Sequence, residues 1–170
     1  MSNSLRELSA KEVEIVSWLE FYERYFFGAT DIERFAKDQK QRYNIISRFL
    51  RKGRIVKLNR RKYYLIPMKA KSGSWTEHPF IIVDEIMDGK DYCIGGWAAA
   101  SYWRLTEQIP MRTDVYTTRR YGPVRLLNTR IFFHHTTRRA LAKGVSETIQ
   151  GHAFRILPKE ESRKWLKSHQ

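Results

Sequence analysis

The chain has 170 residues, with 32 Lys and Arg against 18 Asp and Glu, and therefore a formal net charge of +14. Hydrophobic residues make up 42% and aromatic residues 14%, which is enough for a folded core and excludes a disordered basic tail. No apolar stretch approaches the roughly 20 residues of a membrane helix, and the single Cys93 excludes an internal disulfide and a cysteine-based zinc finger. Since no signal-peptide pattern opens the chain, we expect a cytoplasmic protein with a polyanionic partner and no membrane partner.

The positive charge is concentrated in one segment. Residues 39–76 contain 12 basic and no acidic residues, whereas residues 1–38 contain 5 basic and 8 acidic ones. Residues 77–170 are closer to balance, with 15 basic and 10 acidic residues. Ordinary solvated surfaces mix both signs, so this segregation favours a nucleic-acid contact surface over a merely soluble face.

Two capping-box patterns predict the first two helices. Ser9 with Glu12 opens a helix that we expect to end at Gly28, with an apolar face made of Val13, Val16, Leu19, Tyr22 and Phe26. Thr30 with Glu33 opens a short second helix, whose inward residues are expected to be Ile32, Phe35 and Ala36.

A third helix is predicted from about Gln39 to Lys52, with Gly53 just after its end. At 100° per residue, the apolar residues Tyr43, Ile45, Ile46, Phe49 and Leu50 cover one broad side. The remaining arc holds only non-acidic side chains that can hydrogen-bond, namely Lys40, Gln41, Asn44, Ser47, Arg48, Arg51 and Lys52. Asn and Gln suit adenine edges and Arg suits guanine, so this helix is predicted to read bases in the major groove of duplex DNA.

A β-hairpin is predicted next, because Ile55-Val56 and Tyr63–Ile66 flank a basic tip at Asn59–Lys62. Three helices followed by a basic hairpin are the order of a winged helix-turn-helix, whose wing lies along the phosphate backbone. The residues predicted to contact the backbone are Thr30, Arg42, Lys57, Asn59, Arg60, Arg61 and Lys62.

The predicted fold is α+β, with a winged helix-turn-helix domain at residues 1–68, a linker at 69–76 and a small mixed α/β domain at 77–170. In the second domain, residues 80–83 fit either a strand or the start of a helix. We also expect an extended segment leading into a helix at 98–103, strands near 115–118 and 131–133, a hairpin around 148–157 and a helix at 160–167. The segment between Asp114 and Glu147 contains no acid, which predicts a second basic patch made of Arg119, Arg120, Arg125, Arg130, Arg138 and Arg139.

Catalytic patterns are weak, and we expect no enzyme activity, no cofactor and no metal site. His134 and His135 are adjacent on a predicted strand, so they point to opposite faces. Ser101 lacks the G-x-S-x-G pattern of a nucleophile elbow, and Gly95-Gly96 is not followed by the Lys-Ser/Thr of a P-loop.

The segments SRFLRKGRIVKLNRRKYYLIP (47–67) and YCIGGWAAASYWRLTEQIPMRTDVYTTRR (92–120) together resemble AbiEi-family antitoxins of type IV toxin–antitoxin phage-defence systems. The resemblance covers residues from about 9 to 135. It implies a transcriptional regulator whose winged helix represses its own operon and whose second domain counters a nucleotidyltransferase-like toxin.

Two other functions fit the residues. One is a chromatin or RNA-binding protein that uses both basic patches without sequence preference. The other is a nuclease targeted by the winged helix, for which Asp84, Glu85 and Asp88 would supply the acidic cluster. Asp88-Gly89-Lys90 is also ordinary turn chemistry, which we favour. The oligomeric state is left open, because no coiled-coil segment indicates a dimer.

Overall fold

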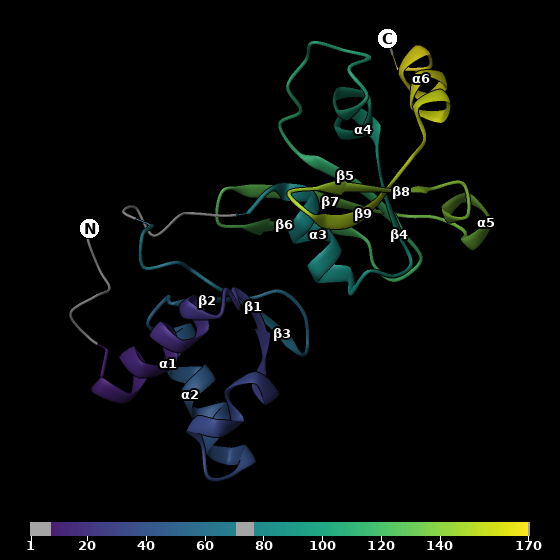
Figure 1. Ribbon diagram of the computed structural model, residues 1–170. Coiled ribbons are helices and arrows are strands. Elements are labelled where there is room, and N and C mark those ends of the chain that lie inside the picture. The colour runs from purple at the N-terminus through teal and green to yellow at the C-terminus, as the bar shows by residue number, and fades with distance from the viewer. Residues whose placement is uncertain (1–7, 71–76, 170) are drawn as a thin grey trace. The chain divides into compact units, whose positions relative to one another are not determined.

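The computed structural model describes residues 8–70 and 77–169 (Figure 1). The chain divides into two compact units, residues 1–75 and 76–170, and each unit is described by itself. Each unit combines helices with its own sheet, which confirms the predicted α+β class. Most of the predicted linker, residues 71–76, lies outside the described residues.

The first unit contains three helical segments and three short strands. Their bounds are α1 (Ala10–Phe21), β1 (Phe26–Gly28), the 3-10 helix η1 (Ala29–Phe35), α2 (Gln39–Arg51), β2 (Ile55–Lys57) and β3 (Lys62–Leu65). The middle strand of the sheet is β3, which pairs antiparallel with β1 on one side and with β2 on the other. This order is compatible with the predicted winged helix-turn-helix, with η1 and α2 as the helix pair and the β2–β3 hairpin as the wing.

One apolar core joins these elements. Each of the three helical segments contributes fully buried residues, namely Ile15 and Leu19 from α1, Ile32 from η1, and Ile45 and Phe49 from α2. Fully burying a side chain of this size stabilises a fold by about 1.5–3 kcal/mol. This core fixes which side of α2 faces solvent.

The first helix is shorter than predicted, and its buried face is rotated. It ends at Phe21, because Glu23 adopts a left-handed conformation (φ 53°) and the Arg24 N–H donates to the Leu19 carbonyl. This is a Schellman ending with a glutamate in the position that glycine usually takes. Phe26, which we placed on the helix, belongs to β1 instead. Val13 and Tyr22 are exposed, and Ile15 takes the inward position.

The second helical segment also differs from its prediction. It is a 3-10 helix that begins at Ala29, and Thr30 does not cap it. The Asp31 carboxylate accepts from the Gly28 N–H at 2.7 Å instead. The inward orientation of Ile32 is confirmed, since its side chain is fully buried.

The second unit is built on a six-stranded sheet. Its elements are α3 (Pro79–Met87), β4 (Tyr92–Gly95), α4 (Gly96–Tyr102), β5 (Thr113–Thr117), β6 (Gly122–Leu126), β7 (Thr129–His135), α5 (Arg138–Leu141), β8 (Val145–Ile149), β9 (His152–Ile156) and α6 (Lys159–Lys167). The strand order is β6-β7-β5-β4-β9-β8. The pairs β5–β7 and β4–β9 are parallel, and the other neighbours are antiparallel.

The two faces of this sheet are covered by different helices. One face packs on α3, where the Phe80 and Phe154 rings lie 5.1 Å apart, and the opposite face carries α4 and α6 (Figure 1). These two helices meet through Trp97 and Trp165, whose ring centroids are 5.5 Å apart. On that face a Cβ on Gly95 would lie 2.5 Å from the Tyr116 ring, so only glycine permits this close approach.

Most predicted elements of the second unit are present, and the open alternative at residues 80–83 is decided in favour of a helix. Pro79 occupies the first turn of α3, where its missing N–H costs no hydrogen bond. Two elements were missed, namely β6 (Gly122–Leu126) and the short helix α5 (Arg138–Leu141). The segment of β6 contains Pro123 and opens on Gly122, both of which argue against a strand on local propensity.

Candidate nucleic-acid interface

The solvent-facing side of α2 is centred on four polar residues of the predicted arc. Lys40, Asn44, Ser47 and Arg51 are exposed, and their side chains have no hydrogen-bond or ion-pair partner among the described residues. Their spacing places them on one stripe of the helix. An amide, a hydroxyl and two cations on one exposed stripe match the donor and acceptor needs of base edges and phosphates.

The predicted arc is flanked by apolar residues that the sequence placed inside. Tyr43 is 51% exposed and Leu50 is 37% exposed, so only the middle of the predicted apolar side is buried. The exposed surface of α2 is therefore partly aromatic and apolar. Contacts of this kind suit thymine methyl groups and sugars as well as base edges.

The start of α2 uses two predicted contact residues for its own structure. Asp38 caps the helix by accepting from the Gln41 N–H at 2.7 Å, and the Gln41 side chain accepts from the Lys37 N–H at 2.6 Å. The Arg42 guanidinium lies 3.3 Å from the Glu33 carboxylate of η1. The predicted base contact by Gln41 and phosphate contact by Arg42 therefore compete with contacts inside the fold.

The other edge of the arc is tied to α1. Glu12 is only 1% exposed, and its Oε2 accepts from Lys52 Nζ at 2.7 Å and from the Ser9 N–H at 2.8 Å. Arg48 Nε lies 3.4 Å from the other carboxylate oxygen. Lys52 and Arg48 thus neutralise a buried acid, so the predicted DNA contacts by these two residues compete with a pair inside the fold.

Burial and pairing act in opposite directions on Glu12. Desolvation raises the pKa of its carboxyl, but the hydrogen bonds from Lys52 and Ser9 outweigh that effect, and the pKa lies below its ordinary value. The carboxylate therefore stays charged, and it holds the C-terminal turn of α2 against the start of α1. Position and orientation of α2 depend on this pair.

The tip of the β2–β3 hairpin presents two arginines. Arg60 and Arg61 are exposed, as is Lys57 at the end of β2. The Asn59 side chain has a structural role instead, because its Oδ1 accepts from the Arg61 and Lys62 N–H groups at 2.9 Å each. These two bonds fix the turn that carries the two arginines.

The basic segment is less uniformly exposed than its composition suggests. Arg54 is 4% exposed, and its guanidinium donates to the Ile66 carbonyl at 2.8 Å. Desolvation lowers the pKa of Arg54, and nearby Glu20 raises it in part. Arg54 is therefore a structural residue of the first unit and takes no part in the exposed surface.

A pocket of about 180 Å³ lies between the start of η1, α2 and the hairpin tip. It is lined by Gly28, Ala29, Thr30, Tyr43, Arg60, Arg61 and Tyr63. Burial raises the pKa of the Tyr63 hydroxyl, with a smaller contribution from Tyr43, so the hydroxyl stays a proton donor. The structure thus brings the predicted contact residue Thr30 next to both hairpin arginines, in a pocket that holds hydroxyl and guanidinium donors.

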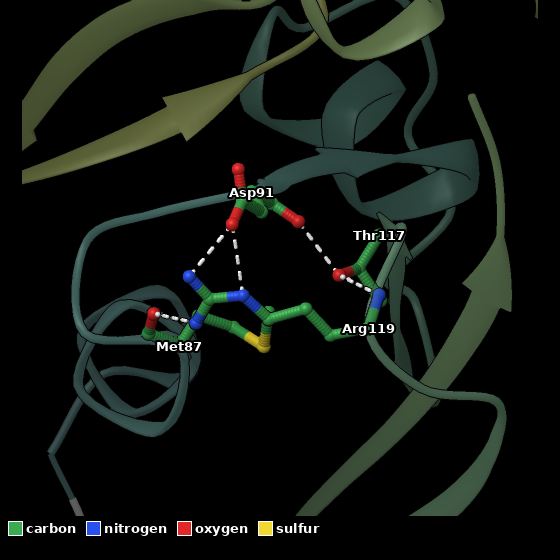
Figure 2. Close-up of polar contacts among 4 residues, drawn as sticks. All are labelled: Met87, Asp91, Thr117 and Arg119. Carbon is green, nitrogen blue, oxygen red and sulfur yellow. Dashed lines mark hydrogen bonds and ion pairs between the residues drawn. The ribbon is translucent and has the colours of Figure 1, made fainter. Parts of the chain in front are cut away.

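The arginines predicted for the second basic patch lie on several different elements of the second unit. Arg119 binds the Asp91 carboxylate through Nε at 2.9 Å and through one terminal nitrogen at 2.7 Å, and its other terminal nitrogen donates to the Met87 carbonyl at 3.1 Å (Figure 2). The Thr117 hydroxyl completes the cluster, since it donates to the Asp91 carbonyl and accepts from the Arg119 N–H. Arg119 therefore connects the end of α3 and the end of β5 to the residue before β4, and its acidic partner lies 28 residues away in sequence.

The remaining arginines of the predicted patch lie in other stretches of the chain. Arg120 lies 4.4 Å from the centroid of Phe133, and burial lowers the pKa of its guanidinium. Arg125 and Arg130 lie opposite each other on β6 and β7. Arg138 and Arg139 belong to α5.

A larger pocket of about 490 Å³ lies beside α5. It is lined by Gly89, Lys90, Asp91, Tyr92, Arg138, Leu141, Ala142 and Arg155. The Arg155 guanidinium donates to the Gly144 carbonyl at 3.0 Å and so is partly used by the fold. The sequence did not predict this pocket, because its basic residues Lys90, Arg138 and Arg155 come from three separate segments of the chain.

Among the acidic residues considered for a nuclease, Asp84 makes hydrogen bonds inside the fold. The Tyr92 hydroxyl donates to Asp84 Oδ1 at 2.6 Å, and His152 Nε2 lies 2.9 Å from Asp84 Oδ2. Asp88 has a left-handed conformation at the end of α3 (φ 54°), which agrees with the turn interpretation of Asp88-Gly89-Lys90. Cys93 is buried, and burial raises the pKa of its thiol to about 12, opposed in part by Arg155.

No protein-family model matches the chain, and no curated protein matches it significantly. The helices in the described ranges are all too short or too polar to cross a bilayer.

Proposed function

We propose that the chain is a sequence-specific regulator of transcription that binds duplex DNA through α2 and the β2–β3 hairpin. One observation carries the proposal. The exposed stripe of Lys40, Asn44, Ser47 and Arg51 has no internal partner among the described residues and lies on the most basic stretch of the chain. Side chains of these types that the fold does not use are available to base edges and phosphates.

The hairpin supports the same proposal from a second element. Its tip carries Arg60 and Arg61 on a turn fixed by Asn59. Backbone contacts by such a tip would set the register of α2 in the major groove without reading sequence. The pocket between Tyr43 and the two arginines is the site that we assign to a phosphate at this junction.

The resemblance to AbiEi-family antitoxins extends the proposal to a specific biological role. In that role the first unit represses the chain's own operon, and the second unit counters a nucleotidyltransferase-like toxin. Only the residues that carry the resemblance support this extension, at 47–67 and 92–120.

The DNA-binding proposal is tested by selecting duplexes from a random library with the full chain. The preferred duplex is then challenged with an excess of random duplex in an anisotropy titration. A specific regulator keeps its preferred site, with an affinity about a thousandfold or more above that for random DNA. Equal affinity for both duplexes would refute this proposal and favour the non-specific chromatin or RNA-binding alternative.

The antitoxin role is tested separately by growth. A neighbouring gene that encodes a nucleotidyltransferase-like protein is expressed alone and together with this chain. Relief of growth arrest by the full chain supports the antitoxin role. Persistent arrest with normal operator binding refutes it and leaves the DNA-binding proposal standing.

A further inference from the structure

We propose that the second unit's sheet binds single-stranded nucleic acid at its β6 edge, where β6 and β7 pair. This site goes beyond the proposed duplex binding, which concerns only the first unit. In this proposal, bases stack on one fixed arginine and one exposed tyrosine, and phosphates bind at two further arginines. The site is named here the β6–β7 face and consists of Arg112, Tyr121, Arg125, Arg130 and Phe132.

Strand register places the members of this face on the same side of the sheet. Phe132 of β7 pairs with Asp114 of β5 on one side and with Pro123 of β6 on the other. Directly paired residues share a face, and residues two apart on a strand return to it. Arg130 therefore lies on the side of Phe132, and its partner Arg125 lies there too.

Arg112 is held in place before any ligand binds. Its Nε donates at 3.0 Å to Asp114 Oδ1, and Asp114 is itself only 4% exposed. The guanidinium carbon lies 5.0 Å from the centroid of Phe132, over the ring. The Arg112 side chain is nevertheless 54% exposed. A planar guanidinium fixed from one side and open on the other is a stacking surface for an unpaired base.

Preorganisation makes this arginine more useful than a mobile one. Ordering a long side chain on binding costs conformational entropy, and Asp114 and Phe132 have already ordered Arg112. His134 strengthens the arrangement, because its Nε2 lies 2.8 Å from the same Asp114 oxygen. One oxygen of the buried carboxylate thus contacts both Arg112 and His134, and it keeps Arg112 in position.

A second ring lies beside this stack. Tyr121 is 74% exposed, and its ring meets Phe132 edge-on with centroids 5.5 Å apart. Exposed aromatic rings next to cations bind successive bases in single-strand-binding proteins without strong sequence preference. Duplex DNA cannot use them in this way, because its bases are already stacked on each other.

Arg125 and Arg130 supply the charge for the backbone. They are exposed directly opposite each other, and neither has an acidic partner among the residues that the structure describes. Like charges at paired positions of a sheet destabilise it. A phosphate bound between the two arginines would remove this repulsion. A single-stranded nucleic acid supplies both the phosphates for these arginines and the base rings for Arg112 and Tyr121.

The test compares three fluorescent ligands on the full chain, a single-stranded DNA of about ten nucleotides, the same sequence as RNA, and its DNA duplex. Arg112→Lys keeps the charge and removes the plane, so we expect about tenfold weaker binding of the single strands and unchanged duplex binding. Arg125→Gln combined with Arg130→Gln should reduce the salt slope for single strands by about 1.4.

Both variants change exposed side chains, and circular dichroism checks that they fold. Arg139→Lys, the same exchange at an exposed position of α5, is the control for Arg112→Lys and should leave single-strand binding unchanged.

These measurements separate the outcomes. Loss of single-strand affinity in both variants supports the site, and tighter binding of RNA than DNA identifies a contact to the 2′-hydroxyl. Single strands that do not bind, or bind equally to Arg112→Lys and the wild type, overturn the proposal. Equal losses for duplex and single strands also overturn it, because they indicate a duplex-backbone contact. A protein that binds this face while the oligonucleotides do not would assign it to a protein partner instead. Failure here with intact operator binding leaves the proposed function untouched.

Discussion

Lys52 Nζ lies 2.7 Å from Glu12 Oε2, across 40 residues of sequence. The pair joins the C-terminal cap of α2 to the first turn of α1. A cation at a helix C-terminus and an anion at a helix N-terminus each interact favourably with the helix dipole. One contact therefore stabilises two helix ends and fixes the orientation of the helix that we propose reads DNA.

Replacing this acid should destabilise the first unit. Glu12→Gln keeps the size of the side chain and loses the charge, so we expect the free energy of unfolding to fall by about 2 kcal/mol. Urea denaturation at neutral pH measures the change. Glu14→Gln, an exposed glutamate on the same helix, should change it by less than about 0.5 kcal/mol. Equal losses of unfolding free energy in the two variants would show that the buried pair with Lys52 adds no stability beyond that of an exposed glutamate.

The same pair predicts a dependence on pH. The pKa of Glu12 is lowered in the folded state, so its contribution is fully present above the unfolded pKa, about 4.3. The contribution is lost as the pH falls through the lower folded pKa. The difference in unfolding free energy between the wild type and Glu12→Gln should therefore shrink as the pH falls below about 4. A difference that stays constant from neutral to acidic pH would contradict this assignment.

Periodicity and capping patterns predicted α2 well. The helix lies at Gln39–Arg51, against a predicted 39–52, and its buried stripe of Ile45, Ile46 and Phe49 was part of the predicted apolar side. The end of α1 was missed, because Glu23 adopts a left-handed conformation for which glycine is the usual sequence signal. The three-residue strand β1 was missed for a different reason. Its stability comes from pairing with β3, which lies far along the chain.

Composition predicted where the cations are in sequence, and it failed to predict which of them are free. Arg119 is neutralised by Asp91, and Lys52 by Glu12, from segments that composition treats separately. Only the fold brings these partners together. Lys40, Asn44, Ser47 and Arg51 needed no such information, because helical periodicity alone placed them on the side opposite the core.

The hairpin tip should contribute to affinity without reading sequence. Replacing Arg60 and Arg61 together by Gln should reduce the salt slope of duplex binding by up to about 0.9 per lost phosphate contact, equally on preferred and random duplexes. Anisotropy titrations at several salt concentrations measure the slope. Lys11→Gln changes one charge at an exposed position of α1, away from the hairpin, and should leave the slope unchanged. An unchanged slope in the double variant would remove the hairpin from the interface.

Two arginines of the second unit should behave in opposite ways on mutation. Arg119→Gln breaks the pair with Asp91 and the bond to the Met87 carbonyl, so we expect a loss of stability of about 1 kcal/mol. Arg125→Gln removes the repulsion with Arg130, so stability should be unchanged or rise by a few tenths of a kcal/mol. Thermal unfolding compares them at equal charge. A larger loss for Arg125→Gln than for Arg119→Gln would contradict the roles given to both residues.

The central claim is that the exposed stripe of α2 reads DNA sequence, and Asn44→Ala tests it most directly. The affinities of this variant for the selected duplex and for a random duplex are measured at one salt concentration, beside the wild type. We predict a loss of about 1–3 kcal/mol, or roughly tenfold to a hundredfold, on the selected duplex. Binding to the random duplex should change little, because Asn44 is uncharged. Equal changes on the two duplexes, or none on either, would contradict sequence reading by this stripe.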